Sequence, residues 1–249
     1  LKTVQKMDGA ELSACVNRPC ILAEDECYNC EWSTELYVPQ AFEEYVKAWC
    51  ACKIMARVYG LGDPEGFVFN MSVGYDLEGI RGEKVDTFLN SMKDASETSI
   101  FRECIRVLKE FFPGEAAFID SISPRVSGSV TVSTLHGCPP DEIERIASYL
   151  IAEKGLHTFV KCNPTILGYE KARSILDGMG YDYVAFDDHH FNEDLQYVDA
   201  VPMFRRLSAL AGERGLEFGL KLSNTFPVDV KAGELPSEEM YMAGKSLFP

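Results

Sequence analysis

The sequence has no apolar run that approaches the ~18–20 residues needed to span a bilayer. It also has no segment with the character of a secretory signal peptide. Its nine cysteines are an odd number, which in a chain of this size favours free thiols in a reducing compartment over a disulfide framework. We therefore expect a cytoplasmic protein that does not bind membranes.

Basic residues are scarce. The 24 lysines and arginines stand against 39 aspartates and glutamates, for a formal net charge of −15. A surface this acidic repels nucleic-acid phosphates and anionic lipids, which argues against both as partners. A small-molecule substrate is the expected ligand.

Three sequence motifs are absent: the G-x-G-x-x-G fingerprint, the Walker loop and the G-x-S-x-G elbow. Their absence excludes Rossmann dinucleotide binding, P-loop phosphoryl transfer and α/β-hydrolase chemistry from this segment.

Short apolar runs alternate with amphipathic runs, which predicts strands alternating with helices. The stretch 10–39 is different, because it is acidic, bears cysteines and resembles a long loop-like insertion. The predicted strands are Leu1–Gln5, Phe67–Val73, Val130–Leu135, Thr158–Cys162, Tyr183–Phe186 and Phe218–Leu222. The predicted helices are Gln40–Tyr59, Lys84–Ala95, Ile100–Phe112, Asp141–Lys154, Glu170–Met179, Val201–Arg214 and a short one at Glu238–Lys245.

This alternation predicts βαβ units and a parallel sheet. Six strands are too few for a closed TIM barrel, which needs eight. The chain is therefore either an open doubly wound sheet or a barrel with strands missing. Because it begins at Leu1 without Met and ends abruptly at Leu247-Phe248-Pro249, we expect an incomplete (β/α)8 barrel over residues 1–249, with its first and last strands missing.

Lysines inside predicted strands are the sharpest functional signal. Lys161 lies in an otherwise apolar strand, where a buried cation is costly unless a negative group meets it. Asn163, two residues later, shares its face. Lys2 and Lys221 also lie in strands, so several ammonium groups could bind an anion such as a flavin phosphate or a reduced flavin ring. The alternative is a buried stem whose head pairs with a carboxylate.

Two further groups of residues could carry chemistry. Cys138, in His-Gly-Cys-Pro-Pro, directly precedes a predicted helix, where the helix dipole favours a thiolate; it could act as a catalytic acid, base or nucleophile, or simply form a turn. The run 187–190, Asp-Asp-His-His, has metal-binding residue types, but neighbouring side chains on an extended chain alternate faces, so no metal site is predicted. Cys27 and Cys30 form a C-x2-C pair of the kind that iron–sulfur and zinc sites use, but together with Cys15 and Cys20 they match no standard spacing, which favours unrelated thiols over a metal site.

Several motifs together carry a family resemblance: ELSACVNRPCILAEDECYNCEWSTE, FNMSVGYDLEGI, STLHGCPPDEIE, GLHTFVKCNPTILGY and LPSEEMYMAGKSLFP. Along nearly the whole chain they resemble the "putative selenate reductase subunit" family of multidomain flavo-iron–sulfur proteins. The resemblance implies a barrel similar to dihydroorotate and dihydropyrimidine dehydrogenases, with FMN as its cofactor. It also implies FAD, NAD(P) and 4Fe-4S clusters in domains outside this chain.

The resemblance also implies residue roles. Lys2 and Thr3 look like the strand-end pair that contacts the flavin, and Lys161 in FVKCNP like the lysine that holds the flavin ring. Asn224 and Thr225 resemble the pair at the flavin or substrate edge. The chain departs from the pattern at 133–138, Ser-Thr-Leu-His-Gly-Cys, which replaces an Asn-x-Ser-x-Pro-Asn strand end. It departs again at Asp76, where an Asn would suit a pyrimidine, so a pyrimidine substrate is not expected.

Three hypotheses follow. In the first, the chain is a segment of a flavin-dependent oxidoreductase that exchanges electrons with a small substrate or with redox partner subunits. Lys2, Thr3, Lys161 and Asn163 would lie at the flavin, Asn224 and Thr225 at the substrate edge, and Cys138 would be a proton donor. In the second, the barrel is a non-catalytic docking module. In the third, Lys161 or Lys221 forms a Schiff base in a lyase.

Overall fold

The structure is a computed structural model, and it describes residues 3–4, 20–23, 26–29, 37–74, 76–133, 137–233 and 238–247. Its centre is a five-stranded parallel sheet in the order β1-β4-β5-β6-β7. The strands are β1 (Thr3–Val4), β4 (Asn70–Gly74), β5 (Ser129–Ser133), β6 (His157–Cys162) and β7 (Phe218–Leu222). The predicted parallel α/β architecture is therefore confirmed.

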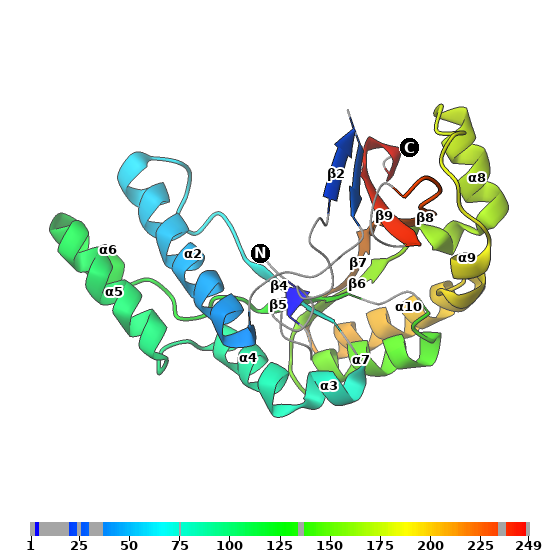
Figure 1. The fold of residues 1–249 in the computed structure, drawn as a ribbon. Coiled ribbons are helices and arrows are strands. Elements are labelled where there is room, and N and C mark those ends of the chain that lie inside the picture. Colours follow the sequence, from blue (N-terminus) through cyan, green and yellow to red (C-terminus); the bar gives the residue numbers. More distant parts are fainter. Residues whose placement is uncertain are drawn as a thin grey trace.

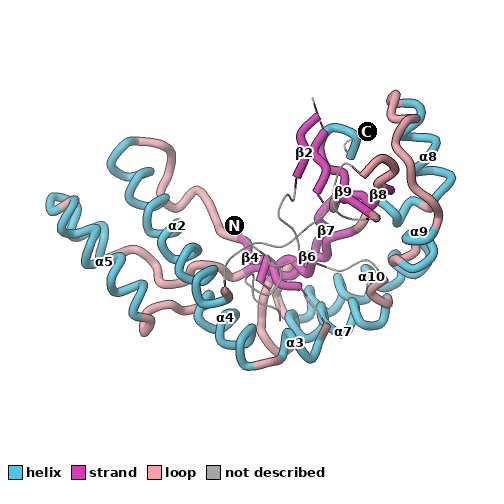
Figure 2. Tube along the Cα trace, in the orientation of Figure 1, coloured by secondary structure: helices cyan, strands magenta, loops and turns pink. Residues whose placement is uncertain are grey.

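The strand order follows the chain order without reversal. A doubly wound sheet reverses its order at a switch point, so that alternative is excluded among the described strands. The helices α3, α7 and α10 lie together along one face of the sheet, as expected of a barrel wall (Figure 1). The sheet and its helices form an open, curved layer (Figure 2).

The helix layer forms because its apolar faces pack on the outward side of the strands. Beneath β6, Val160 packs with residues of α7 and α10 in one buried cluster. The long helix α2 packs on α4 and α5 in a larger cluster that also includes Met71 and Val73 of β4. The helices are α2 (Val38–Tyr59), α3 (Leu77–Arg81), α4 (Glu83–Lys93), α5 (Ser99–Phe111), α6 (Ala116–Asp120), α7 (Pro140–Ala152), α8 (Tyr169–Gly178), α9 (His189–Glu193) and α10 (Tyr197–Glu213), with short 3₁₀ turns η1 (Pro113–Glu115), η2 (Pro164–Leu167) and η3 (Lys245–Leu247).

A second, antiparallel sheet has the order β2-β3-β9-β8. It joins β2 (Cys20–Ala23) and β3 (Glu26–Asn29) to β8 (Phe226–Asp229) and β9 (Glu239–Gly244). The segment 10–39 therefore contains a strand pair where we expected only a loop. Cys20 and Cys27 lie on these strands, whereas Cys15 and Cys30 lie outside the described residues.

Two predicted elements are wrong. Tyr183–Phe186 is not a strand; Val184 is buried in a small cluster with Phe226 and Val228, and Ala185 accepts one hydrogen bond from Asp229. The predicted helix at Glu238–Lys245 is instead β9, because pairing with β3 and β8 overrides the helix propensity of its Glu, Met and Ala residues.

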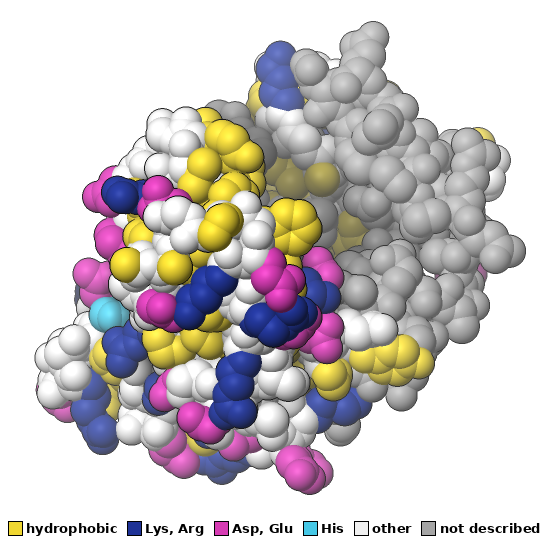
Figure 3. Space-filling view, turned by 90° about the vertical axis from the view of Figure 1, so that its left-hand side faces the viewer, with side chains coloured by type: hydrophobic (Ala, Val, Ile, Leu, Met, Phe, Trp, Pro, Cys, Tyr) yellow, Lys and Arg dark blue, Asp and Glu magenta, His cyan; other side chains and the backbone are white. Residues whose placement is uncertain are grey.

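The surface carries interspersed opposite charges, and Figure 3 shows this on the side nearest α5 and α6. Arg106 pairs with Glu103 and Glu110 along α5, and Lys109 pairs with Asp120 of α6. Such exposed pairs contribute little to stability. No helix in the described part of the chain is both long and apolar enough to cross a bilayer.

Candidate active site

A buried carboxylate organises the carboxyl ends of β5 and β6. Asp194, just after α9, is 4% exposed. Its Oδ2 accepts hydrogen bonds from Asn163 Nδ2 at 3.1 Å and Thr165 Oγ1 at 2.5 Å. Its Oδ1 accepts from the Gly137 amide at 2.7 Å, and Gly137 has a φ of 76°, a conformation that favours glycine. One acid therefore ties the loop after β5 to the loop after β6.

The network continues to the end of β7. Asn163 Oδ1 accepts from Asn224 Nδ2 at 2.7 Å, and Asn224 Oδ1 lies 3.4 Å from the hydroxyl of Thr225. The structure thus brings Asn163, Asn224 and Thr225 together, three of the residues predicted for the site. The carboxyl ends of strands are where parallel α/β domains bind ligands.

Lys161 lies on the concave face of the sheet. Thr158, Val160 and Cys162 alternate with it along β6 and are buried against the helix layer, so Lys161 points the opposite way. Its side chain is half-buried. Lys161 is paired in register with Lys221 of β7, so the two lysine side chains lie on the same face of the sheet. Burial and the charge of Lys221 lower the pKa of Lys161 to about 8.

Cys138 joins the same group of residues. It lines a small internal cavity of about 10 Å³ together with Lys161, Asn163 and Asp194, a space of about one water molecule. Burial, with the nearby charges of Glu142 and other acids, raises the pKa of Cys138 to about 11. The expectation of a favoured thiolate is therefore wrong, because burial and acidic neighbours outweigh the helix dipole.

An aromatic ring and an apolar pocket flank these polar groups. A Cβ built on Gly219 of β7 would lie 2.7 Å from two ring atoms of Phe159, so the ring covers Gly219 on the concave face. Next to Asn163, a pocket of about 240 Å³ is lined mainly by apolar side chains of η2, α8 and the end of β7, including Ile166, Leu176 and Leu222. The site therefore combines cations, amides and apolar surface.

The two flavin contacts predicted on the first strand are not tested by the structure. Lys2 lies outside the described residues. Thr3 of β1 pairs with Ser72 of β4, three strands away from β6, or about 14 Å at the usual strand spacing. A role for Lys2 and Thr3 at the flavin therefore stays a prediction.

The residues Asp187 to His190 do not converge. His190 Nε2 lies 2.8 Å from Glu239 of β9, whereas His189 lies 3.6 Å from Glu193 on its own helix. Asp187 accepts a hydrogen bond from the backbone of His189. Within the described ranges, no group of three or more His, Cys, Asp or Glu side chains could hold a metal ion.

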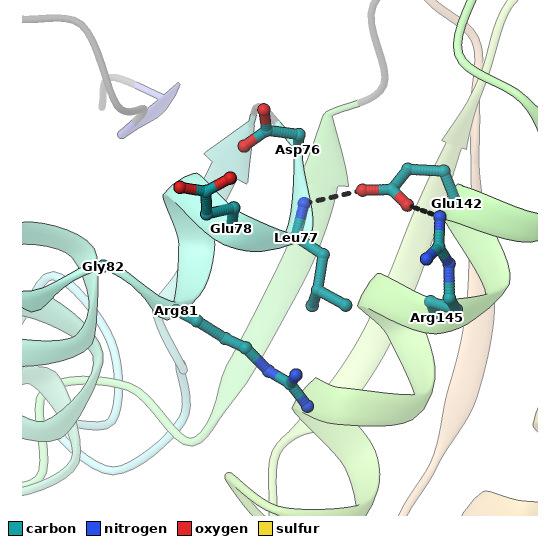
Figure 4. Close-up of a pocket in the computed structure, with 7 residues that line it drawn as sticks. All are labelled: Asp76, Leu77, Glu78, Arg81, Gly82, Glu142 and Arg145. Carbon is teal, nitrogen blue, oxygen red and sulfur yellow. Dashed lines mark hydrogen bonds and ion pairs between the residues drawn. The ribbon is translucent and has the colours of Figure 1, made fainter.

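A larger surface cleft of about 630 Å³ lies between α3 and α7 (Figure 4). Asp76, the residue noted as a departure from the dehydrogenase pattern, caps α3 by accepting from the Gly79 amide at 2.7 Å. Glu142 of α7 accepts from the Leu77 amide at 2.8 Å and also pairs with Arg145. Glu142 therefore joins the start of α7 to the start of α3. Asp76 has a structural role as the cap of α3.

Sequence reasoning missed Asp194. It stands in the acidic run Asn192-Glu193-Asp194-Leu195, where nothing in the spacing separates it from a solvated carboxylate. Only its burial and its three donors distinguish it. The single available signal was its position after a predicted strand, and that strand does not form.

A parallel α/β wall whose strand ends carry lysines, amides and a buried acid is typical of (β/α)-barrel enzymes. Comparison with known proteins identifies the family. The whole chain, residues 1–249, matches the family model described as "Oxidoreductase YgfK, N-terminal TIM-barrel domain", and the chain belongs to this family. It is 44% identical over 265 residues to proteins named "Putative oxidoreductase YgfK" from Escherichia coli strain K12 and from E. coli O157:H7. The match covers 100% of this chain but 25% of each relative, so the chain spans about a quarter of their length.

Proposed function

We propose that this chain is part of the flavin-binding barrel of an oxidoreductase, in which electrons pass between a small substrate and other domains or redox partner subunits. The observation that carries the proposal is the pair Lys161 and Lys221, in register on the concave face beside the asparagine network. Membership of an oxidoreductase family supports it. The barrel type, similar to dihydroorotate and dihydropyrimidine dehydrogenases and closed by strands outside this chain, is part of the same proposal.

The residues present fit an anionic, planar group such as FMN. Burial and a neighbouring ammonium both disfavour charge on Lys161, and a bound anion would relieve both effects. The ring of Phe159 adds aromatic surface next to these cations, and Gly219 leaves room for it. Lys161 and Asn163 are therefore the residues that would hold the flavin.

When bound, FMN supplies the hydride and electron chemistry. The protein's contribution is electrostatic and geometric. Lys161 would stabilise negative charge on a flavin bound beside it, because a preorganised cation away from water needs no reorganisation during the reaction. Asn224 and Thr225 offer amide and hydroxyl groups for orienting a substrate. Cys138 keeps its proton on Sγ at neutral pH, so it can serve as a donor but not as a nucleophile.

The remaining three quarters of the full-length relatives would supply the other redox centres. We propose that FAD, NAD(P) and 4Fe-4S clusters are held there, as the resemblance to selenate reductase subunits implies. Selenate is the substrate that the name of this family suggests.

The proposal is tested on the purified full-length protein. The visible spectrum is recorded, and nucleotide released by denaturation is identified by mass and titrated back. We expect FMN bound with Lys161 in place, and binding at least about tenfold weaker in Lys161→Met, since a charge-assisted contact contributes about 1.5–3 kcal/mol. Lys171→Met, on α8, is the matched control. A protein that releases no FMN on denaturation and takes up none in the titration defeats the proposal and favours the docking module, whatever colour other redox centres give it.

A second function is supported by one observation, the lowered pKa of Lys161. An amine desolvated next to another cation is the usual nucleophile of Schiff-base lyases, where it condenses with a carbonyl and releases water. Borohydride reduction in the presence of small keto acids, followed by peptide mass mapping, tests this. An adduct on Lys161 supports a lyase, and its absence excludes one for the carbonyls used.

A further inference from the structure

The direction of the hydrogen bonds at the strand ends is set by Asp194. A carboxylate can only accept, and Asp194 accepts hydrogen bonds from the Gly137 amide, the Thr165 hydroxyl and the Asn163 Nδ2. The Asn163 amide therefore has one allowed orientation, with its nitrogen toward Asp194. Its oxygen must then face the next residue in the network.

That constraint passes on to Asn224. Because Asn163 presents Oδ1, Asn224 must present Nδ2, and the two atoms lie 2.7 Å apart. The oxygen of Asn224 is left on the other side, near the Thr225 hydroxyl at 3.4 Å. At the edge predicted to meet the ligand, Asn224 thus presents a hydrogen-bond acceptor. Asp194 determines this orientation through Asn163.

An amide in place of the acid would break this order. Asn at position 194 keeps one acceptor for Gly137 but offers an NH₂ group where Oδ2 now accepts. That NH₂ would face the Nδ2 of Asn163, and two facing donors in a site 4–8% exposed are costly. The conflict is relieved only when the amides of Asn163 and Asn224 both turn over.

We propose that Asp194 is a positioning residue that fixes the amide orientation of Asn163 and, through it, of Asn224. The ligand edge therefore presents a carbonyl oxygen and selects a group that donates an N–H or O–H. The claim about the ligand rests on the proposed function, whereas the claim about the network does not.

The experiment is an exchange of acid and amide in the full-length protein. Asp194→Asn reverses the required donor pattern, and Asn163→Asp puts two carboxylates face to face. The double variant Asp194→Asn with Asn163→Asp restores the pattern, because Asp at 163 accepts from both sides and the Thr165 hydroxyl can rotate to accept. Glu193→Gln, an exposed neighbour on α9, is the control for loss of one negative charge.

Two readouts separate the two claims. The first is the urea midpoint at which the buried Cys162 becomes reactive to a thiol reagent. The second is FMN affinity by fluorescence titration. We expect each single variant to lower the midpoint and to weaken FMN binding on the order of tenfold, and the double variant to return within about threefold of the parent. A residue that only fills space would show no such rescue.

If the double variant is no better than Asp194→Asn, or if Asp194→Asn changes nothing, the positioning claim is overturned. If no variant, including the parent, binds FMN while the Cys162 midpoints show the rescue, the proposed function fails and the positioning claim stands.

Discussion

Replacing Lys161 with Met removes a positive charge that is unfavourable in the folded protein. The structure places this ammonium in a half-buried position beside Lys221, and together these effects lower its pKa from 10.5 to about 8. A difference of this size corresponds to at most about 3 kcal/mol, and partial solvent exposure reduces it to about 2 kcal/mol. Met keeps the apolar stem and removes the charge, so we expect Lys161→Met to stabilise the fold at neutral pH.

The sign of the pH dependence follows from the direction of the shift. Below about pH 8 the lysine is protonated in both the folded and unfolded states, and the folded state bears the full cost. Between about pH 8 and 10.5 it is neutral when folded but still protonated when unfolded, so the parent gains stability as pH rises. The advantage of Lys161→Met should therefore shrink across this window and vanish above it.

The assay is pulse proteolysis in urea on the full-length protein after removal of FMN, because a bound anion would offset the cost of the Lys161 charge, and peptides of this domain are followed by mass spectrometry. Lys154→Met serves as a contrast, because burial lowers the pKa of Lys154 but its contacts with Asp86 and Tyr149 outweigh burial and raise it, so its removal should destabilise the fold at neutral pH. The reasoning about Lys161 is refuted if Lys161→Met destabilises at pH 7, or if its effect is the same at pH 7 and pH 10.

Three further outcomes are expected. Gly219→Ala should destabilise the fold by about 1–3 kcal/mol, because the added Cβ would lie 2.7 Å from the Phe159 ring. In thermal melts, combining it with Phe159→Leu should recover part of this loss, and no recovery would contradict the contact. Lys53, 1% exposed, binds the Pro64 carbonyl at 2.5 Å and the mostly exposed Glu65 at 3.0 Å, with its ammonium 4.2 Å from the Trp49 ring. Lys53→Ala should cost about 2–4 kcal/mol but Lys53→Met less than about 1 kcal/mol in urea unfolding, since the stem carries the packing; equal losses would show that the charge matters more. Cys138 should alkylate far more slowly than the exposed Cys52 at pH 8 and accelerate toward pH 11, and an equal rate at pH 8 would contradict the raised pKa.

Sequence periodicity predicted the elements that pack by their own amphipathic faces. β7 has the predicted bounds Phe218–Leu222, and α7 begins at Pro140, one residue before its predicted start. Apart from Tyr183–Phe186, the failures are at β9 and at the strand pair β2 and β3, and β3 pairs with β9 across more than 200 residues of chain. Such pairing depends on distant partners, which local propensity cannot report.

The candidate site divides in the same way. Lys161, Asn163 and Asn224 were accessible from the sequence, because a lysine in an apolar strand and polar residues just after strands have a visible pattern. Asp194 was not, since its importance comes from three donors on loops far apart in the chain. The protonation state of Cys138 could not be predicted either. Burial and acids from other segments raise its pKa and outweigh the helix dipole at the helix start that the sequence revealed.

The central claim is that an anionic flavin lies against Lys161 and Lys221. Lysine footprinting of the full-length protein with a trace amine reagent, with and without saturating FMN, tests it directly. We expect FMN to protect Lys161 and Lys221 and to move the half-reaction pH of Lys161 upward from about 8, while Lys171 and Lys231 react unchanged. Unchanged reactivity of Lys161 in a protein that has bound FMN would contradict the claim.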